Sequence, residues 1–135
     1  MHWKSLNPEE WANLQPYVDT ALLPVVHIDG TDWANALSRC ARLATWADRV
    51  EQLLAGRLVR LPLLTLYGAA TLDEAVAALK ATFVHVVVLT DTAPFERPGI
   101  RVLSTNGQEG DVAARVAEEI VALWNRQERE NPHND

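Results

Sequence analysis

Apolar runs rich in β-branched residues alternate along this chain with stretches of helical periodicity. The runs cover residues 20–28, 58–66 and 83–89, and a shorter one covers residues 100–103. Strands that are apolar at nearly every position are typical of sheets covered on both faces, and strands that alternate with helices indicate parallel pairing. We therefore expect an α/β fold: a single three-layer, Rossmann-like domain with a mostly parallel sheet of about four strands and helices on both faces.

Helix start and stop signals lie in the segments between these runs. Asn7 and Pro8 begin a helix to about residue 17, and Asp32 caps a long helix that ends at Gly56. A Thr-x-x-Glu capping box at residues 71–74 predicts a third helix, to about residue 82, and Asp111 caps the last one. In the long helix we expect a buried apolar stripe, formed by Trp33, Leu37, Cys40, Ala44, Ala47, Val50 and Leu54.

Proline interrupts two of the expected strands. Pro24 lies inside the first run and Pro62 inside the second, and proline has no N–H to donate to a neighbouring strand. The first strand is therefore predicted to lie at an edge of the sheet or to be bulged, and the second to have interrupted pairing. Residues 1–127 are expected to form the domain, and the polar segment 128–135 is expected to be frayed.

The composition limits the classes of partner. The 135 residues carry a formal net charge of −6, so the chain lacks the positive field of a nucleic-acid-binding protein. Its apolar runs are far shorter than the roughly 20 residues that cross a bilayer, which predicts no membrane insertion. Cys40 is the single cysteine, and residues 1–10 lack a signal-peptide pattern. We expect a cytoplasmic protein without disulfides.

In parallel sheets, ligands bind beyond the carboxyl ends of the strands. The polar or aromatic residues that follow the expected strands are our candidates for ligand binding: His27, Asp29, Thr31, Tyr67, Thr90 and Asp91. Neither a GxGxxG nor a GxxxxGK[ST] motif occurs, so we expect no dinucleotide or nucleoside triphosphate cofactor.

Three of these candidates have side chains that bind metals. His27 and Asp29 are two residues apart on an extended backbone, and with Asp91 they form a possible site of one imidazole and two carboxylates. The alternative is a hydrogen-bonded histidine and an aspartate that shapes a turn. We expect the alternative, and hence no bound metal. His85 and Cys40 are expected to pack in the interior and not to act in catalysis.

Five tryptophans are a high number for this length. Trp11 and Trp46 are the candidates for an interface, because exposed tryptophan beside arginine is typical of binding hot spots and Trp46 lies near several arginines of its helix. The alternative is that these rings cover the edges of the core.

Several segments together resemble the YpiF-like proteins of Bacillus and related Firmicutes, the DUF2487 family. The likeness lies in residues 1–4 (Met-His-Trp-Lys), 17–24 (Tyr-Val-Asp-Thr-Ala-Leu-Leu-Pro), 53–62 (Leu-Leu-Ala-Gly-Arg-Leu-Val-Arg-Leu-Pro) and 65–67 (Thr-Leu-Tyr). The family is uncharacterised, so the resemblance implies a bacterial protein of unknown function and no particular activity.

A second, fainter likeness is to the opening of creatininase-type metal-dependent amidohydrolases. Residues 22–25 followed by 28–30, and later Leu61-Pro62 before Tyr67-Gly68, are similar to segments of those enzymes. The resemblance implies that Asp29 stands at the position of a metal-binding glutamate, but Thr31 or Asp32 falls where a ligand histidine is expected. This difference from the family's metal ligands favours a shared fold without the metal-dependent activity.

These observations favour a non-catalytic protein-interaction or self-association module without a cofactor. The alternatives are a small metal-dependent amidohydrolase-like enzyme and a small-ligand sensor that binds at the carboxyl ends of the strands.

Overall fold

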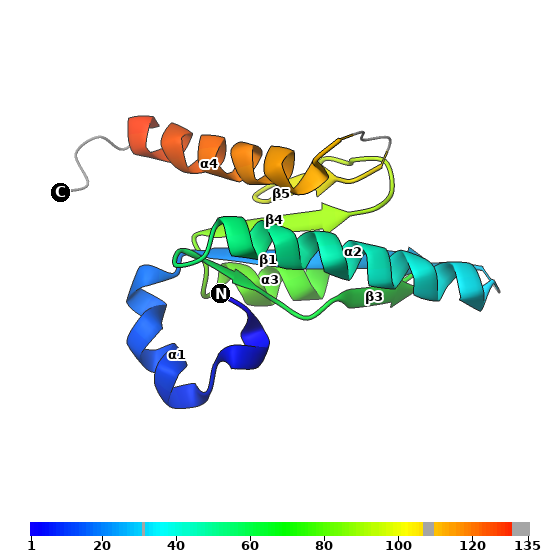
Figure 1. The fold of residues 1–135 in the computed structure, drawn as a ribbon, viewed down its shortest axis with the longest axis horizontal. Helices are drawn as coiled ribbons and strands as arrows, with labels where there is room; N and C mark the ends of the chain where they lie inside the picture. Colours follow the sequence, from blue (N-terminus) through cyan, green and yellow to red (C-terminus); the bar gives the residue numbers. More distant parts are fainter. Residues whose placement is uncertain (31, 107–109, 131–135) are drawn as a thin grey trace.

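A parallel sheet of five strands forms the centre of the computed structural model, which describes residues 1–30, 32–106 and 110–130 (Figure 1). The strand order is β2-β1-β4-β5, and β3 pairs with β1 farther along the same side as β2. The predicted α/β fold with a mostly parallel sheet is confirmed. The second predicted strand forms as two short ones, which gives five strands. Their bounds are β1 (Thr20–Ile28), β2 (Leu58–Arg60), β3 (Leu64–Tyr67), β4 (His85–Thr90) and β5 (Arg101–Ser104).

Both prolines lie where the pairing between β1 and its neighbours is interrupted. Leu22 pairs with Arg60 and Val25 with Leu64, so two residues of β1 lie opposite three residues of the connecting segment. The Leu22 carbonyl accepts from Leu61 N–H at 2.9 Å. Pro24, two residues on, therefore directs its ring nitrogen toward this gap and not toward β4. The predicted interruption is confirmed, and the edge alternative is wrong because β1 has strands on both sides.

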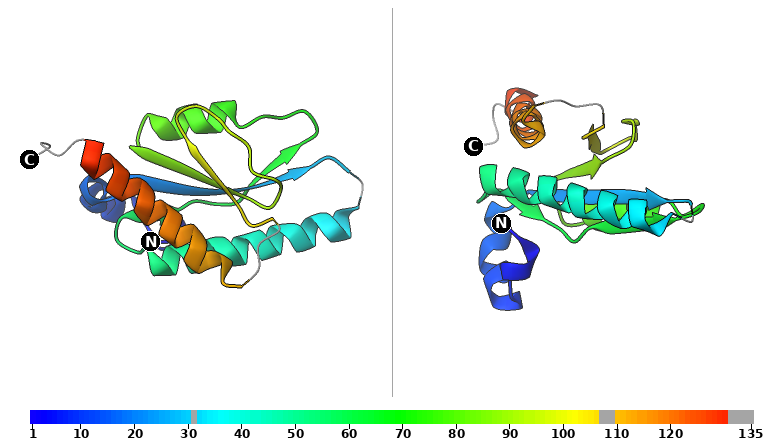
Figure 2. Two further views of the ribbon diagram at one scale, coloured as in Figure 1. Left: turned by 90° about the horizontal axis from the view of Figure 1, so that it is seen from above. Right: turned by 45° about the vertical axis from the view of Figure 1, so that its right-hand side comes forward.

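Helices cover both faces of the sheet (Figure 2). The α2 and α4 helices pack on the face that carries Leu22, Val26, Val87 and Leu89. The α3 helix packs on the opposite face, and the N-terminal helices cover the amino end of that face. The helical elements are η1 (Trp3–Ser5), α1 (Pro8–Leu14), η2 (Gln15–Tyr17), α2 (Trp33–Leu53), α3 (Asp73–Lys80) and α4 (Val112–Glu130).

Three of the four predicted caps form. The side chains of Asn7, Asp32 and Asp111 accept hydrogen bonds from backbone N–H groups three residues later. The capping box at residues 71–74 is wrong, because α3 begins at Asp73 and Leu72 is its cap residue. The Leu72 side chain is buried in the core under this helix, so packing and not a side-chain cap sets where α3 begins.

The predicted buried stripe of α2 is wrong in its first turns. Trp33 and Leu37 are 51% and 64% exposed, and the buried positions of the helix are Ala36, Leu43, Ala47 and Val50. The physical reason is length. A helix of 21 residues extends about 31 Å, whereas the six residues of β4 extend about 20 Å. The first turns of α2 therefore extend past the ends of β4 and β5 (Figure 1).

The last helix follows its predicted cap residue, Asp111, and buries an apolar stripe. Val112, Val116 and Ile120 are buried, and Trp124 is only 8% exposed. The helix continues to Glu130, so the first three residues of the predicted frayed tail are helical. The remainder of that tail, residues 131–135, and the predicted turn at Gly107 lie outside the described residues.

Candidate functional site

The connections of the sheet diverge at the carboxyl ends of β1 and β4. The chain leaves β1 for α2 and then β2 on one side, whereas it leaves β4 for β5 on the other side. Such a reversal of strand order opens a crevice at the carboxyl edge, and ligands of open α/β sheets bind there. The topology therefore predicts that a ligand site lies among the residues around this point.

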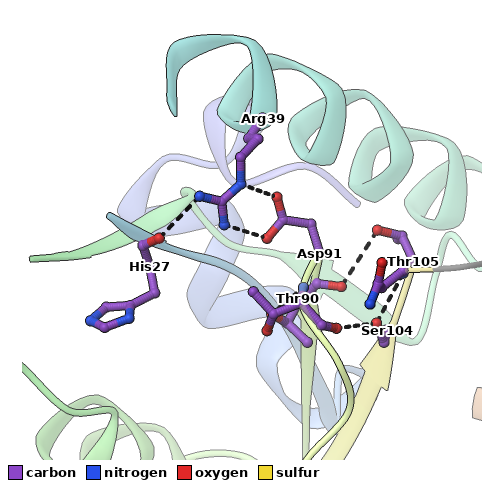
Figure 3. Close-up of polar contacts among 8 residues, drawn as sticks. His27, Arg39, Thr90, Asp91, Ser104 and Thr105 are labelled. Carbon is purple, nitrogen blue, oxygen red and sulfur yellow. Dashed lines mark hydrogen bonds and ion pairs between the residues drawn. The ribbon is translucent and has the colours of Figure 1, made fainter. Parts of the chain in front are cut away.

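An ion pair between α2 and the end of β4 spans the crevice (Figure 3). Arg39 donates from Nε to Asp91 Oδ2 at 2.8 Å and from Nη2 to Oδ1 at 3.0 Å. Its Nη1 donates to the His27 carbonyl oxygen at 3.2 Å, which ties the pair to the end of β1. The hydrogen bonds with Asp91 raise the pKa of Arg39, although burial lowers it. This clamp joins three elements.

A cavity of about 460 Å³ lies beside the clamp, between α2, the ends of β4 and β5, and the start of α4. Its polar and aromatic lining includes Asn35, Arg39, Arg42, Trp46, Asp91 and Asn106. We call it the switch-point cavity. Thr105 N–H donates to the Thr90 carbonyl at 2.9 Å and so continues the β4–β5 pairing into its wall.

The charge of the switch-point cavity is positive. Asp91 neutralises Arg39, whereas Arg42 makes no hydrogen bond or ion pair with the residues that the structure describes. One turn from Arg42 along α2, Trp46 lies half-buried in the wall, and the Arg49 guanidinium is 5.5 Å from the centre of its ring. Arg42 therefore lines the cavity together with Trp46, and a second cationic group contacts the Trp46 ring, which is an arrangement that attracts a small anion.

The three residues of the predicted metal arrangement do not converge. The His27 imidazole points away from Asp91, and its Nε2 makes a hydrogen bond with the Gly68 carbonyl oxygen at 2.5 Å (Figure 3). The Asp91 carboxylate is occupied by Arg39, and Asp29 is exposed. Among residues 1–30, 32–106 and 110–130, no group of three histidine, cysteine or acidic side chains is placed to hold a metal ion.

The other candidates at the carboxyl edge lie apart from the cavity. Tyr67 is 53% exposed, and its ring is 6.2 Å from that of Trp33. Thr90 is buried, and its hydroxyl shares a hydrogen bond of 3.0 Å with Thr92, which is a structural role. Thr31 lies outside the described residues. Of the five predicted ligand-binding residues that the structure describes, Asp91 alone lines the switch-point cavity.

The two interface candidates are half-buried. Trp11 packs against Phe83 with ring centres 5.9 Å apart, which is a contact at the edge of the core. Trp46 packs against the core, as the alternative interpretation expects, and also lines the cavity; its role in an interface stays a prediction. The more exposed aromatic side chains are Trp33, Tyr67 and Tyr17.

The analysis of the sequence missed Arg39, Arg42 and Asn35 as site residues, whereas Asn106 lies in the loop after the fourth expected strand, at the edge where ligands were expected to bind. The arginines stand on the polar face of their helix, where a solvated side chain is the ordinary interpretation. Asp91 lies 52 positions from Arg39, and no sequence signal joins them. The available signal for the site was the position of Asp91 in the loop after β4, because ligands of parallel sheets bind beyond the carboxyl ends of the strands.

Cys40 and His85, which were expected to pack in the interior, are both half-buried. Burial raises the pKa of the Cys40 thiol, although Arg39 lowers it, so the reactive thiolate is disfavoured. His85 is half-buried at the start of β4, on the opposite edge of the sheet from the switch-point cavity.

Comparisons with models of protein families, with curated proteins and with solved structures found no significant match to this chain. The resemblances to YpiF-like proteins and to the amidohydrolases therefore stay predictions. Within the part of the chain that the structure describes, no helix has both the length and the apolar character that a membrane span needs.

Proposed function

We propose that this protein is a non-catalytic binding domain that takes a small anionic ligand, a carboxylate or a phosphate, in the switch-point cavity. The observation that carries the proposal is Arg42, which has no partner among the described residues and stands in the wall of a cavity at the point where the strand order reverses. This is the ligand-sensor alternative among the hypotheses from the sequence.

The arrangement around Arg42 supports an anion over other ligands. The Arg39–Asp91 clamp holds one wall in place, so the site is formed before the ligand arrives and little ordering entropy is lost on binding. Asn35 and Asn106 add amide groups to the lining. Trp46 supplies a flat apolar surface for the remainder of the ligand.

The test is a titration with inorganic phosphate and with acetate, followed by NMR at the indole N–H of Trp46. A saturable shift is expected with at least one of these anions. Replacement of Arg42 by Gln is expected to weaken the binding about tenfold, because one charge-assisted contact is lost. Potassium chloride at the same ionic strength is the control for nonspecific electrostatic screening.

Arg126→Gln is the matched control, because it removes an exposed arginine from α4 that does not line the switch-point cavity. It should leave the Trp46 titration unchanged. The proposal fails if chloride reproduces the shift, if no anion gives a saturable shift, or if Arg42→Gln and Arg126→Gln weaken binding equally.

A separate observation favours a second function, self-association. Trp33, Leu37 and Tyr67 form an exposed apolar patch where α2 extends past the sheet. The patch adjoins β3. Within the described residues, β3 has a hydrogen-bonded neighbour only on its β1 side. The neighbouring strand β2, in contrast, also forms a bridge, between Arg60 and His2. We propose that a second copy of this chain covers the patch, because two such edges can pair around a two-fold axis.

Sedimentation equilibrium tests this second proposal. A dimer is expected for the native chain, and Leu37→Lys is expected to convert it to a monomer. Val121→Lys, which alters an exposed apolar residue of α4, is the control and should leave the dimer intact. A native chain that stays monomeric at the highest attainable concentration overturns the proposal.

A further inference from the structure

A cavity of about 440 Å³ lies beside β5, the strand at the edge of the sheet opposite to β3. Residues 101–104 of β5 line it, together with residues 94–96 of the loop before this strand and with Arg115, Val116 and Glu119 of α4. We call it the β5-edge cavity. It shares no lining residue with the switch-point cavity.

The backbone of β5 directs hydrogen-bonding groups away from the sheet in this region. Thr105 N–H donates to the Thr90 carbonyl, so the odd-numbered residues of β5 turn their N–H and carbonyl groups toward β4. The N–H and carbonyl groups of Val102 and Ser104 therefore point outward, and within the described ranges none of them forms a hydrogen bond. An edge of this kind is a template for one more strand.

The cavity also offers apolar surface to the side chains of an added strand. Phe95 of the loop is 39% exposed, and the buried side chains of Val102 and Val116 belong to the lining. Extended segments that add to a sheet edge gain affinity from main-chain hydrogen bonds and specificity from pockets for alternate side chains. The β5-edge cavity provides both kinds of contact.

Arg115 gives the α4 side of the cavity an unbalanced positive charge. Its guanidinium forms no hydrogen bond or ion pair with any residue that the structure describes. Nη2 is enclosed, whereas Nε and Nη1 are not among the enclosed atoms, so these two nitrogens are the ones that a ligand can reach. The other charged groups do not neutralise Arg115, because Glu119 holds Arg101 at 3.0 Å and Glu96 lies exposed in the loop. Arg115 therefore favours a ligand that brings a carboxylate.

From this geometry we infer that β5 binds an extended acidic segment of a partner protein as an added strand, which pairs with the backbone of Val102 and Ser104 and places one carboxylate against Arg115. Side chains alternate along a strand, so the acidic residue faces α4 and its two neighbours face the other way. The site is independent of the functions proposed above, because neither the switch-point cavity nor the β3 edge includes these residues.

The probe is a synthetic hexapeptide with blocked ends, in which valine and threonine surround one central aspartate. Hydrogen exchange of the Val102 and Ser104 amides, measured by NMR, is expected to slow several-fold when this peptide is saturating. The same peptide with asparagine in place of aspartate should bind about tenfold more weakly, because one charge-assisted contact is lost.

Two N-methylated versions of the aspartate peptide test the pairing of the backbones. Each is methylated at one of the two alternating sets of residues. Only the set whose N–H groups face β5 is needed for pairing, so one version should lose binding and the other should keep it.

Arg115→Gln is expected to remove the preference for aspartate over asparagine. Arg126→Gln is the matched control, because it removes an exposed arginine from the same helix that does not line the β5-edge cavity, and it should leave the preference at about tenfold.

The inference fails if no peptide slows exchange at Val102 and Ser104, if the native chain binds the asparagine peptide equally well, or if the two N-methylated peptides bind alike. A preference for aspartate that survives Arg115→Gln also rejects it. Protection of these amides that increases with the concentration of the native chain alone identifies a second copy as the occupant and rejects the partner segment. The native chain supplies every comparison between peptides, so these results stand even if Arg115→Gln does not fold.

Discussion

A hydrogen bond between β1 and α4 provides the sharpest test of how this fold is held together. Trp124 donates from its indole Nε1 to Thr20 Oγ1 at 2.8 Å, across 104 positions of the sequence. Thr20 is fully buried, and Trp124 is 8% exposed. The Thr20 hydroxyl in turn donates to Asp19 Oδ1 at 2.9 Å. One hydroxyl thus satisfies a buried indole and helps to hold a carboxylate.

Thr20→Val keeps the shape of the side chain and removes this hydroxyl. The indole N–H is then buried without an acceptor, which costs about 1–3 kcal/mol, and Asp19 keeps only its bonds from Arg57. We expect a loss of about 2 kcal/mol. An unfolding entropy of about 2.1 cal/mol/K per residue converts this loss to a decrease in Tm of about 7 °C for the whole chain.

The measurement is a double-mutant cycle by urea unfolding, with Trp124→Phe as the second change. Phenylalanine has no N–H to leave unsatisfied, so Thr20→Val should cost about 1 kcal/mol less in that background. Thr45→Val is the control, because Thr45 bonds only a carbonyl of its own exposed helix face. An equal cost of Thr20→Val in both backgrounds would refute the reasoning.

Other contacts give four further predictions. Because burial lowers the pKa of His85, the neutral ring favours folding, and the free energy of unfolding should decrease as the pH falls below 6.5; urea midpoints should show this decrease, and His85→Phe should remove it. The pKa of Asp19 is also lowered, since the bonds from Arg57 and Thr20 outweigh burial, so a second decrease should begin as the pH falls below 3.8 and be absent from Asp19→Asn. Asp91→Asn should destabilise the fold by about 1–2 kcal/mol, because Arg39 stays three-quarters buried without its counter-charge, yet it should tighten phosphate binding; unchanged binding would contradict the charge argument. Leu22→Ala should cost about 2–5 kcal/mol by urea unfolding, because Leu22 is fully buried between the sheet and its helices; a cost near zero would contradict the assignment of the core.

Local patterns in the sequence predicted most of the elements. The cap residues Asn7, Asp32 and Asp111 act on N–H groups three residues away, so their role needs no tertiary information. The run at 83–89 forms the central strand β4 because consecutive apolar side chains need cover on both faces. The apolar side chains along α4 are buried for a similar reason, since the helix packs on one face of the sheet.

Errors arose where the neighbourhood of a residue depends on the length or direction of a distant element. Trp33 and Leu37 fit an apolar stripe but are exposed, because the first turns of α2 extend past the ends of β4 and β5 (Figure 1) and the Trp33 ring lies only beside the exposed Tyr67. Thr71 matches a capping box, but the packing of Leu72 moves the start of the helix.

By itself, the sequence determined the α/β class, the parallel pairing and the edge of the sheet where the switch-point cavity lies. These depend on periodicity and on chain connectivity, which are local or topological properties. Only the tertiary structure decided that Asp91 binds Arg39, and that Arg42 lines a cavity beside Trp46 without a partner among the described residues. Which groups meet depends on how the helices lie across the sheet, and a pattern of residue types does not specify the distances between side chains on different elements.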